Sequence, residues 1–274
     1  MDKRRMCPHC RAFITTDDRV CPYCENVVGP RQIDRRSPAP IFGGLIPHAR
    51  FITVMILLVN FALYIAMTLS SMQAGNNSAI SSLDVRTLFN FGAKSRQAIF
   101  AGQWWRLVTA GFLHGGIVHI LMNSWVLFDV GASAEEMYGA SRLIVIYFVS
   151  TVTGFLVSAY WSPAISVGAS APIMGLIGAM IALGMRSTTP MGSAIRGFYI
   201  RWAIFGLVLG LMPGVDNAAH LGGIAGGFLV GYIAGAPKLV NNWAEKFWRA
   251  ASGVSLALTA YCFLQMFLWL LGSQ

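Results

Sequence analysis

The feature that most constrains this chain is a series of long, nearly charge-free apolar stretches that follows residue 50. Of its 274 residues, 55% are hydrophobic and only 11% are charged, whereas soluble domains carry about 25% charged residues. A helix needs about 20 consecutive apolar residues to cross a bilayer core. The pattern therefore predicts an all-α protein that crosses a membrane several times, and it argues against a soluble globular domain.

We expect seven membrane-spanning helices, of which the second and fifth are short. They lie near residues 51–70, 116–130, 143–160, 170–185, 199–211, 217–234 and 252–271. The polar, basic N-terminal residues contain no secretory signal. With the N-terminus in the cytosol, sixteen of the 20 Lys and Arg residues fall inside and four fall outside. Cytoplasmic loops are enriched in these residues, so we predict a cytosolic N-terminus and an outside C-terminus in a plasma or inner membrane.

The composition divides the chain into four parts. Residues 1–28 carry paired cysteines, 29–50 form a basic Pro/Gly linker, 51–235 hold six spans, and 236–274 hold a basic loop and the seventh span. The loop 71–113 is too long for a plain connector. It contains Trp104 and Trp105, so we expect it to pack on the protein and dip into the membrane interface. Arg106 is expected to snorkel or to bond backbone carbonyls in that loop.

Two Cys-Pro-x-Cys pairs stand near the N-terminus, Cys7 with Cys10 and Cys21 with Cys24. Such pairs supply four thiolates to one tetrahedral Zn²⁺. So short a segment cannot bury a core, and metal binding would supply its folding free energy. Disulfides or free thiols are the alternative, and a cytosolic location argues against disulfides. We predict a zinc ribbon in which the metal either simply supports folding or also lets the ribbon hold a cytosolic partner. We expect no nucleic-acid binding, because the segment has no helix that could read bases.

Polar residues inside the apolar stretches mark the candidate site. Ser170 opens one span, and His220 lies about one turn inside another. Polar side chains at membrane depth are uncommon and usually serve a site, and a serine becomes a nucleophile when a base accepts its proton. In the predicted topology both spans run from outside to inside, so the two side chains lie at similar depth.

Small residues line one face of each of these two spans. The two sets are Gly223, Gly227, Gly231 and Gly235, and Ala171, Gly175, Gly178 and Ala182. Such stripes let two helix backbones approach closely. We therefore predict that Ser170 and His220 come within hydrogen-bond reach. Taken singly, a helix-packing serine and a core histidine are the alternative interpretations.

A serine protease also needs hydrogen-bond donors for the negative charge that develops on the substrate oxygen. His119 and Asn123 are four residues apart, so on a helix they project the same way, and His114 precedes them. A metal site made of the three membrane histidines is the alternative, but no nearby Asp or Glu completes it. Asp216 is expected to cap the helix of His220 rather than to act as a third catalytic residue.

Together these residues resemble the rhomboid family of intramembrane serine proteases. The matches, in chain order, are Trp105-Arg106, His114, His119-x-x-x-Asn123, Glu135-x-x-x-Gly139, Gly168-x-Ser170 and Ala219-His220-x-x-Gly223-x-x-x-Gly227. The resemblance covers about residues 50–235 and implies a six-helix core, with Ser170 as nucleophile and His220 as general base. It assigns the oxyanion and substrate-binding role to His119, Asn123, Gly168 and the Ser170 amide. His114, Arg106 and Glu135 are then structural supports, and Glu135 is expected either to bond loop backbone or to be a surface charge.

The resemblance further implies that water reaches the serine from the outer face and that no cofactor takes part in catalysis. Its substrates would be single-span membrane proteins, cut near small, helix-destabilising residues. Two residues depart from the family pattern: Ala171 follows the serine where Gly is common, and Met174 replaces an aromatic residue that often stacks on the histidine. The zinc ribbon and the seventh span lie outside the resemblance.

Two other functions are alternatives to an active protease. A catalytically inactive relative that binds membrane-protein clients is the first, and the presence of both Ser170 and His220 favours activity instead. A transporter or channel is the second. Its transport path would need charged or ion-coordinating groups, whereas these spans are nearly charge-free.

Overall fold

The computed structural model describes residues 4–7, 9–15, 18–28, 50–237 and 243–272. The chain divides into two compact units, residues 1–48 and 49–274, and each is described by itself. Apart from Arg50, the predicted linker 29–50 lies outside the described residues. The finer division of the chain into four parts stays a prediction.

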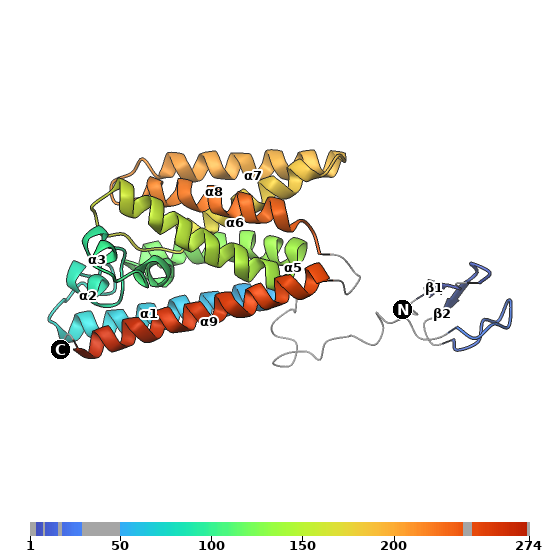
Figure 1. Cartoon of the computed structure of the whole chain (residues 1–274), viewed down its shortest axis with the longest axis horizontal. Helices are drawn as coiled ribbons and strands as arrows, with labels where there is room; N and C mark the ends of the chain where they lie inside the picture. The colour runs from blue at the N-terminus through green and yellow to red at the C-terminus, as the bar shows by residue number, and fades with distance from the viewer. Residues whose placement is uncertain (1–3, 8, 16–17, 29–49, 238–242, 273–274) are drawn as a thin grey trace. The chain divides into compact units, whose positions relative to one another are not determined.

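The second unit is helical, as the apolar stretches predict (Figure 1). Its elements are α1 (Phe51–Gln73), α2 (Val85–Asn90), α3 (Arg96–Phe100), α4 (Arg106–Thr109), the 3₁₀ turn η4 (Ala110–Phe112), α5 (Ile117–Trp161), α6 (Ser170–Arg186), α7 (Pro190–Leu209), α8 (Asn217–Ala234) and α9 (Trp243–Gly272). By length and composition, α1, α5 and α9 are long and apolar enough to cross a membrane, and α6 is a shorter apolar helix. The six-helix core and the additional C-terminal helix are confirmed.

The long element α5 accounts for two of the predicted spans. Its backbone leaves helical geometry at Gly139, where φ is 74° and ψ is 161°. A positive φ is costly for residues that carry a Cβ, so glycine allows the break here. Residues 117–138 and 140–161 therefore form two helices in different directions, as the separate stretches 116–130 and 143–160 predict.

Helix α7 begins nine residues before the predicted start of its span. Thr189 caps it by accepting a hydrogen bond from the Gly192 N–H at 3.2 Å, and Pro190 occupies the first turn, where its missing N–H costs nothing. Arg196 and Arg201 interrupt the apolar pattern but not the helix. The predicted span near residues 199–211 covers the second half of this helix, because hydropathy records lipid-compatible residues rather than helix ends.

The loop 71–113 is structured by three short helices and the turn η4. Arg106 is fully buried within it, and its guanidinium donates to the carbonyls of Phe89 and Ala93 at 2.6 and 3.1 Å. It also donates to the Gln103 side chain at 2.7 Å. The predicted bonding of Arg106 to loop carbonyls is therefore confirmed. Trp105 is also buried, and the centre of its ring lies 4.5 Å from the guanidinium carbon of Arg106.

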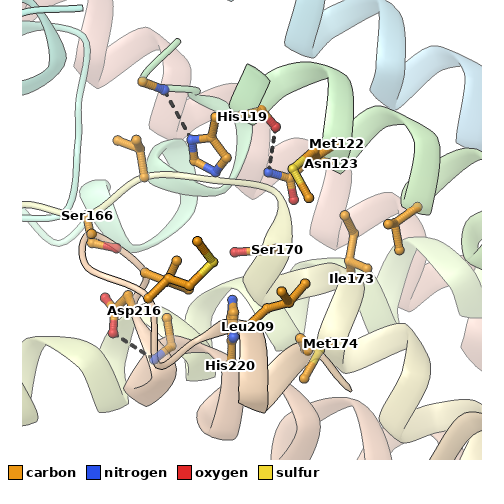
Figure 2. A pocket seen from close by; sticks show the side chains of 18 of the residues that line it. His119, Met122, Asn123, Ser166, Ser170, Ile173, Met174, Leu209, Asp216 and His220 are labelled. Atoms are coloured by element: carbon orange, nitrogen blue, oxygen red, sulfur yellow. Dashed lines mark hydrogen bonds between the residues drawn. The ribbon is translucent and has the colours of Figure 1, made fainter. Parts of the chain in front are cut away.

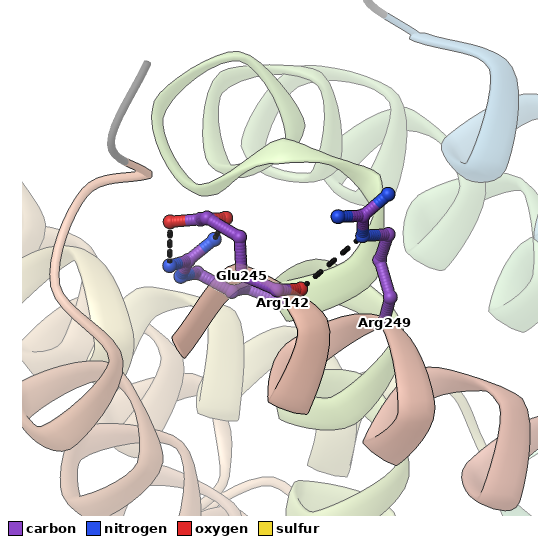
Figure 3. Close-up of polar contacts among 3 residues, drawn as sticks. All are labelled: Arg142, Glu245 and Arg249. Carbon is purple, nitrogen blue, oxygen red and sulfur yellow. Dashed lines mark hydrogen bonds and ion pairs between the residues drawn. The ribbon is translucent and has the colours of Figure 1, made fainter. Parts of the chain in front are cut away.

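Helix α9 is tied to the core at both ends. At its start, Glu245 accepts two hydrogen bonds from Arg142 of α5 at 2.7 and 2.8 Å, as Figure 3 shows. Toward its other end, Tyr261 stacks on Trp104 of the loop 71–113 with ring centroids 5.9 Å apart. In Figure 1, α9 and α1 lie along one side of the helical unit and α7 along the opposite side.

Helices α6 and α8 make the closest backbone approach that the glycines predict. A Cβ on Gly223 would overlap the carbonyl of Ala171, and one on Gly227 would overlap the carbonyl of Gly175. Further along, a Cβ on Gly231 would lie 2.7 Å from the Ala179 Cα. Gly235 does not continue the stripe: it ends α8 with a φ of 58°. The predicted contact is otherwise confirmed.

Replacing Gly227 with alanine is expected to lower the free energy of unfolding by about 1–3 kcal/mol, the usual cost of overpacking. The new methyl group would overlap the Gly175 backbone, so α6 and α8 would have to separate. Unfolding followed in detergent micelles measures the loss.

The matched control is Gly253→Ala on α9, where an added Cβ meets nothing within 4 Å. That variant is expected to be neutral or stabilised by up to about 1 kcal/mol, because alanine favours helix more than glycine does. Equal stability of the Gly227 and Gly253 variants would contradict the close contact.

The start of α1 is held by a carboxylate from α5. Buried Glu135 accepts from the N–H groups of Ile52 and Thr53, both at 2.9 Å, and from the Thr53 hydroxyl at 2.7 Å. Free N–H groups at a helix start attract negative charge. Of the two expectations for Glu135, the structure has it bonding backbone, although that backbone belongs to a helix start rather than to a loop.

Glu135→Gln is expected to cost about 1–3 kcal/mol of stability, because the amide nitrogen cannot accept a hydrogen bond from α1. Its exposed neighbour Glu136 offers the control, since Glu136→Gln should change stability by less than about 0.5 kcal/mol. Thermal unfolding of both variants in the same detergent provides the comparison. A Glu135 variant as stable as wild type would argue against the anchoring role.

Candidate functional site

A cavity of about 530 Å³ opens among α5, α6, α7 and α8. Four residues that the sequence singled out line it: His119, Asn123, Ser170 and His220. Figure 2 shows them around one space, with the His220 ring pointing toward the Ser170 hydroxyl. Serine, the two histidines and the asparagine come from three different helices, so tertiary packing alone brings them together.

Ser170 occupies the first position of α6, after a turn that requires glycine. Gly168 has a φ of 140°, and its N–H donates to the Ala110 carbonyl at 2.9 Å. A Cβ at this position would lie 2.9 Å from His119 Nε2 and 3.5 Å from Ser170 Oγ. Gly168 therefore leaves room for the His119 ring beside the serine, while its own N–H is engaged in the loop.

His220 lies in the first turn of α8 and is buried. Neither ring nitrogen meets strict hydrogen-bond geometry with a partner among the described residues, and the Gly206 backbone forms at most a weak hydrogen bond to the ring. Asp216 caps α8, accepting from the Ala219 N–H at 3.0 Å and from the Ser158 hydroxyl. The predicted cap is confirmed, and the imidazole is left available to the cavity.

His119 has a defined protonation pattern. The Gly115 N–H points to its Nδ1 at 3.3 Å, so Nδ1 accepts and the neutral ring carries its proton on Nε2, the atom nearest Gly168. Asn123 donates one amide hydrogen to the His119 carbonyl at 3.0 Å. Within the part of the chain that the structure describes, no acceptor is assigned to its second amide hydrogen, and the side chain lines the cavity. Both side chains can therefore act as donors beside Ser170.

The predicted supports lie outside the cavity lining. His114 is fully buried behind His119, with the two rings edge to face and their centroids 5.1 Å apart. Arg106 donates to backbone carbonyls of the loop 71–113, and Glu135 accepts from backbone N–H groups at the start of α1. Burial lowers the pKa of Arg106 to about 10, so its guanidinium remains charged at neutral pH.

The rest of the cavity wall is largely apolar. Its apolar residues include Met122, Val126, Ile173, Ile177, Trp202 and Phe205. Met174, one of the two departures from the family pattern, also lines the cavity and packs against α7, where a Cβ on Gly206 would lie 2.7 Å from its sulfur. Apart from Met174, sequence reasoning did not single out these residues, because apolar residues in an apolar helix carry no distinguishing signal.

Lys94 was not assigned to the site from the sequence. It lies in the loop 71–113, is fully buried and bonds the segment that precedes Ser170. Its position directly after the apolar run Phe91-Gly92-Ala93 was the available signal.

The four N-terminal cysteines form a second candidate site in the first unit. Strands β1 (Arg4–Met6) and β2 (Phe13–Thr15) pair antiparallel, and all four sulfurs lie within 4.8 Å of one another. Cys7 and Cys24 sulfurs are 3.7 Å apart, as are those of Cys10 and Cys21. A disulfide would need about 2.05 Å, whereas four sulfurs bound tetrahedrally at about 2.3 Å from zinc lie about 3.8 Å apart. This cluster can hold a metal ion.

The two cysteine pairs share one backbone design. In the first, the Arg11 N–H donates to the Cys7 carbonyl at 3.0 Å, and in the second the Glu25 N–H donates to the Cys21 carbonyl at 2.9 Å. Arg11 and Glu25 both have positive φ values, 60° and 56°. Each pair therefore forms the same tight turn, which presents two sulfurs to one point.

Comparison with known proteins places these features in a family. The Rhomboid domain matches residues 101–237. Rhomboid protease GluP of Bacillus subtilis (strain 168) is 37% identical over 178 residues, which make up 65% of this chain and 35% of that protein. RHOMBOID-like protein 6, mitochondrial, of Arabidopsis thaliana is 39% identical over 152 residues, 54% of this chain and 49% of that protein. Rhomboid-like protease 2 of Toxoplasma gondii is 34% identical over 216 residues, 77% and 75% of the two chains.

The extent of these matches differs among the relatives. The chain spans about a third to a half of the first two and about three quarters of the third. The domain match covers half of this chain and contains the whole cavity site from His119 to His220. Together with its apolar helices, these matches show that the chain is an integral membrane protein and belongs to the rhomboid family.

Proposed function

We propose that this chain is an intramembrane serine endopeptidase that hydrolyses peptide bonds in or near the membrane-spanning segments of other proteins. The observation that carries the proposal is the convergence of Ser170 and His220 on one cavity, with His119 and Asn123 beside them. Two relatives that carry the word protease in their names support the same reaction class.

In this proposal Ser170 and His220 act as a catalytic dyad. His220 takes the Ser170 proton as Oγ attacks the substrate carbonyl, and it then gives that proton to the leaving amine. Water hydrolyses the resulting acyl-enzyme ester, again with His220 as the base. Asp216 serves as a helix cap in this scheme, because its carboxylate already accepts from Ala219 and Ser158.

Three N–H groups would stabilise the tetrahedral intermediate. They are the Nε2–H of His119, the second amide hydrogen of Asn123 and the backbone N–H of Ser170. The last belongs to the first turn of α6, where an N–H has no partner within the helix. Donors held in place before reaction are worth most in a water-poor site. Their rigid attachment to α5 and α6 supports this role.

The substrates proposed here are single-span membrane proteins that reach the cavity from the lipid bilayer. The apolar wall of α5, α6 and α7 residues suits an apolar substrate segment. Small, helix-destabilising residues near the cut would let that segment unwind and expose its carbonyl. The excess of Lys and Arg in the predicted inner loops supports a cytosolic N-terminus and an outer C-terminus.

For the N-terminal unit we propose a structural Zn²⁺ bound by Cys7, Cys10, Cys21 and Cys24. An all-thiolate tetrahedral set is typical of zinc. Its four cysteines belong to the first unit and none of them lines the cavity, so its proposed tasks are folding of the ribbon and contact with a cytosolic partner.

Ser170→Ala is expected to abolish both cleavage of a reporter membrane span and labelling by a fluorophosphonate probe, because the variant lacks the hydroxyl toward which the His220 ring points. Expression and unfolding temperature should stay at the wild-type level. The control is Ser193→Ala, an exposed serine of α7, which should cleave and label normally.

The alternative function, a catalytically inactive client-binding protein, gives a different result. Wild type and Ser170→Ala would then both fail to label, and both would still capture a membrane-span client from detergent extracts. Labelling that persists in Ser170→Ala would instead refute the nucleophile assignment.

Metal analysis of the purified protein is expected to find about one zinc per chain, since the four sulfurs converge on one point. The double variant Cys7→Ser/Cys10→Ser should lose that zinc, while Cys262→Ser, a buried residue of α9, should keep it. Wild-type protein that contains no zinc after purification without chelators would refute the assignment.

A further inference from the structure

Lys94 is a fully buried cation in the loop 71–113, close to the segment that leads into Ser170. Its ammonium donates to the carbonyls of Ser162 and Ala164 at 2.7 and 2.9 Å. Both acceptors belong to residues 162–169, which connect the end of α5 to the start of α6. A lysine loses hydration when it is buried, so it is found there mainly where specific acceptors replace water.

The backbone of Lys94 holds the same segment a second time. Its N–H donates to the Ser166 carbonyl at 2.9 Å, and the Ser166 N–H donates back at 3.2 Å, an isolated antiparallel bridge. Two residues later the Gly168 N–H donates to the Ala110 carbonyl at 2.9 Å. Residues 162–168 are therefore fixed along their length by the loop 71–113, and most of these bonds come from Lys94.

This fixed segment borders the cavity directly. Ser166 and Val167 line it, and Ser170 follows three residues after Val167. Lys94 is in turn held from the other side, because Arg106 donates to the carbonyl of the preceding residue, Ala93, at 3.1 Å. A continuous chain of hydrogen bonds thus runs from Arg106 through Lys94 to the segment before the serine.

Lys94 also lies within electrostatic reach of the other half of the site. Burial lowers the pKa of the Lys94 ammonium, and the carboxylate of Asp216 partly offsets this effect. Asp216 caps the helix that carries His220. One side chain is thereby coupled to the segment before Ser170 by hydrogen bonds and to the start of α8 by charge.

We propose that Lys94 is a positioning residue for the serine reaction: its buried ammonium fixes residues 162–169, and so sets the place of the Ser170 hydroxyl and amide relative to His119 and His220. This inference rests on the proposed protease function. Lys94 itself touches no substrate and none of the reacting groups.

The physical reason is the cost of small displacements. Without the ammonium, the carbonyls of half-buried Ser162 and exposed Ala164 lose the donor that holds them beside Lys94, and the segment can turn toward water to satisfy them. Ser170 and its N–H would shift with it, while the apolar cavity that binds substrate would remain. The loss should therefore fall on kcat rather than on KM.

The test compares Lys94→Met with Arg96→Met in purified, detergent-solubilised protein. Methionine keeps an unbranched apolar chain and removes the donors. Arg96 is a matched cation in the same loop that also donates to two carbonyls, those of Ala159 and Tyr160, but within α5 rather than in residues 162–169. The readouts are the rate constant of fluorophosphonate labelling, kcat and KM for a reporter span, and the unfolding temperature.

Lys94→Met is expected to lower both the labelling rate and kcat by about tenfold or more with KM within about twofold of wild type, since a displacement of about 1 Å can cost about 100-fold. Arg96→Met should stay within about threefold. Hydrogen exchange should rise at the amides of Ser166 and Gly168 in the Lys94 variant only. If Lys94→Met does not fold, Lys94→Gln, which keeps one donor on a shorter chain, is judged by the same measurements.

Labelling and kcat at wild-type levels in the Lys94 variant would overturn the positioning role while leaving the proposed function intact. Equal losses in the Lys94 and Arg96 variants would overturn it too, because they would indicate general loosening of the loop. Failure of the wild-type protein to label or cleave is a distinct result, which removes the proposed function and this inference with it.

Discussion

The arrangement of this protein depends on backbone contact between α6 and α8. In a bilayer, lipid is as apolar as the side chains it would replace, so helices gain little from hiding apolar surface and associate through close packing. Gly223, Gly227 and Gly231 permit that packing by leaving the facing carbonyls and Cα atoms of α6 uncovered. Because Ser170 and His220 both lie in the first turns of these two helices, the spacing of the backbones also determines the spacing of the two side chains.

Hydrogen bonds from the loop 71–113 form a second set of contacts that hold the site in place. Buried Arg106 and Lys94 each donate to two backbone carbonyls: Arg106 to those of Phe89 and Ala93 within the loop, and Lys94 to those of Ser162 and Ala164 in the segment before Ser170. Hydrogen bonds of this kind matter more where water is scarce, since an unmet carbonyl has no substitute partner. Residues 162–169, which precede Ser170, form no helix. Their conformation is set by hydrogen bonds to the loop 71–113.

Residues whose chemistry conflicts with a membrane setting were predictable from the sequence. Ser170, His220, His119 and Asn123 stand out in apolar helices, the glycine stripe has a regular spacing, and the paired cysteines carry a recognisable metal-binding pattern. The start of α7 was not predictable from hydropathy, because the helix continues beyond its apolar part through a stretch that contains Arg196 and Arg201. Lys94 was missed for a different reason: its partners are backbone carbonyls 68 and 70 residues away, and backbone leaves no mark in a sequence.

The ion pair between Arg142 and Glu245 bears on how the six-helix rhomboid core is to be isolated. Arg142 is 4% exposed, and α9 supplies the carboxylate that balances it. A shortened chain that ends before α9 would remove both the carboxylate of Glu245 and the Trp248 ring that lies over this guanidinium, and so would leave a charge uncovered and unbalanced on the surface of the remaining helices. Truncation to six helices is thus not a neutral simplification, and a recombinant fragment would need Arg142 neutralised as well before its activity could be compared with that of the intact chain.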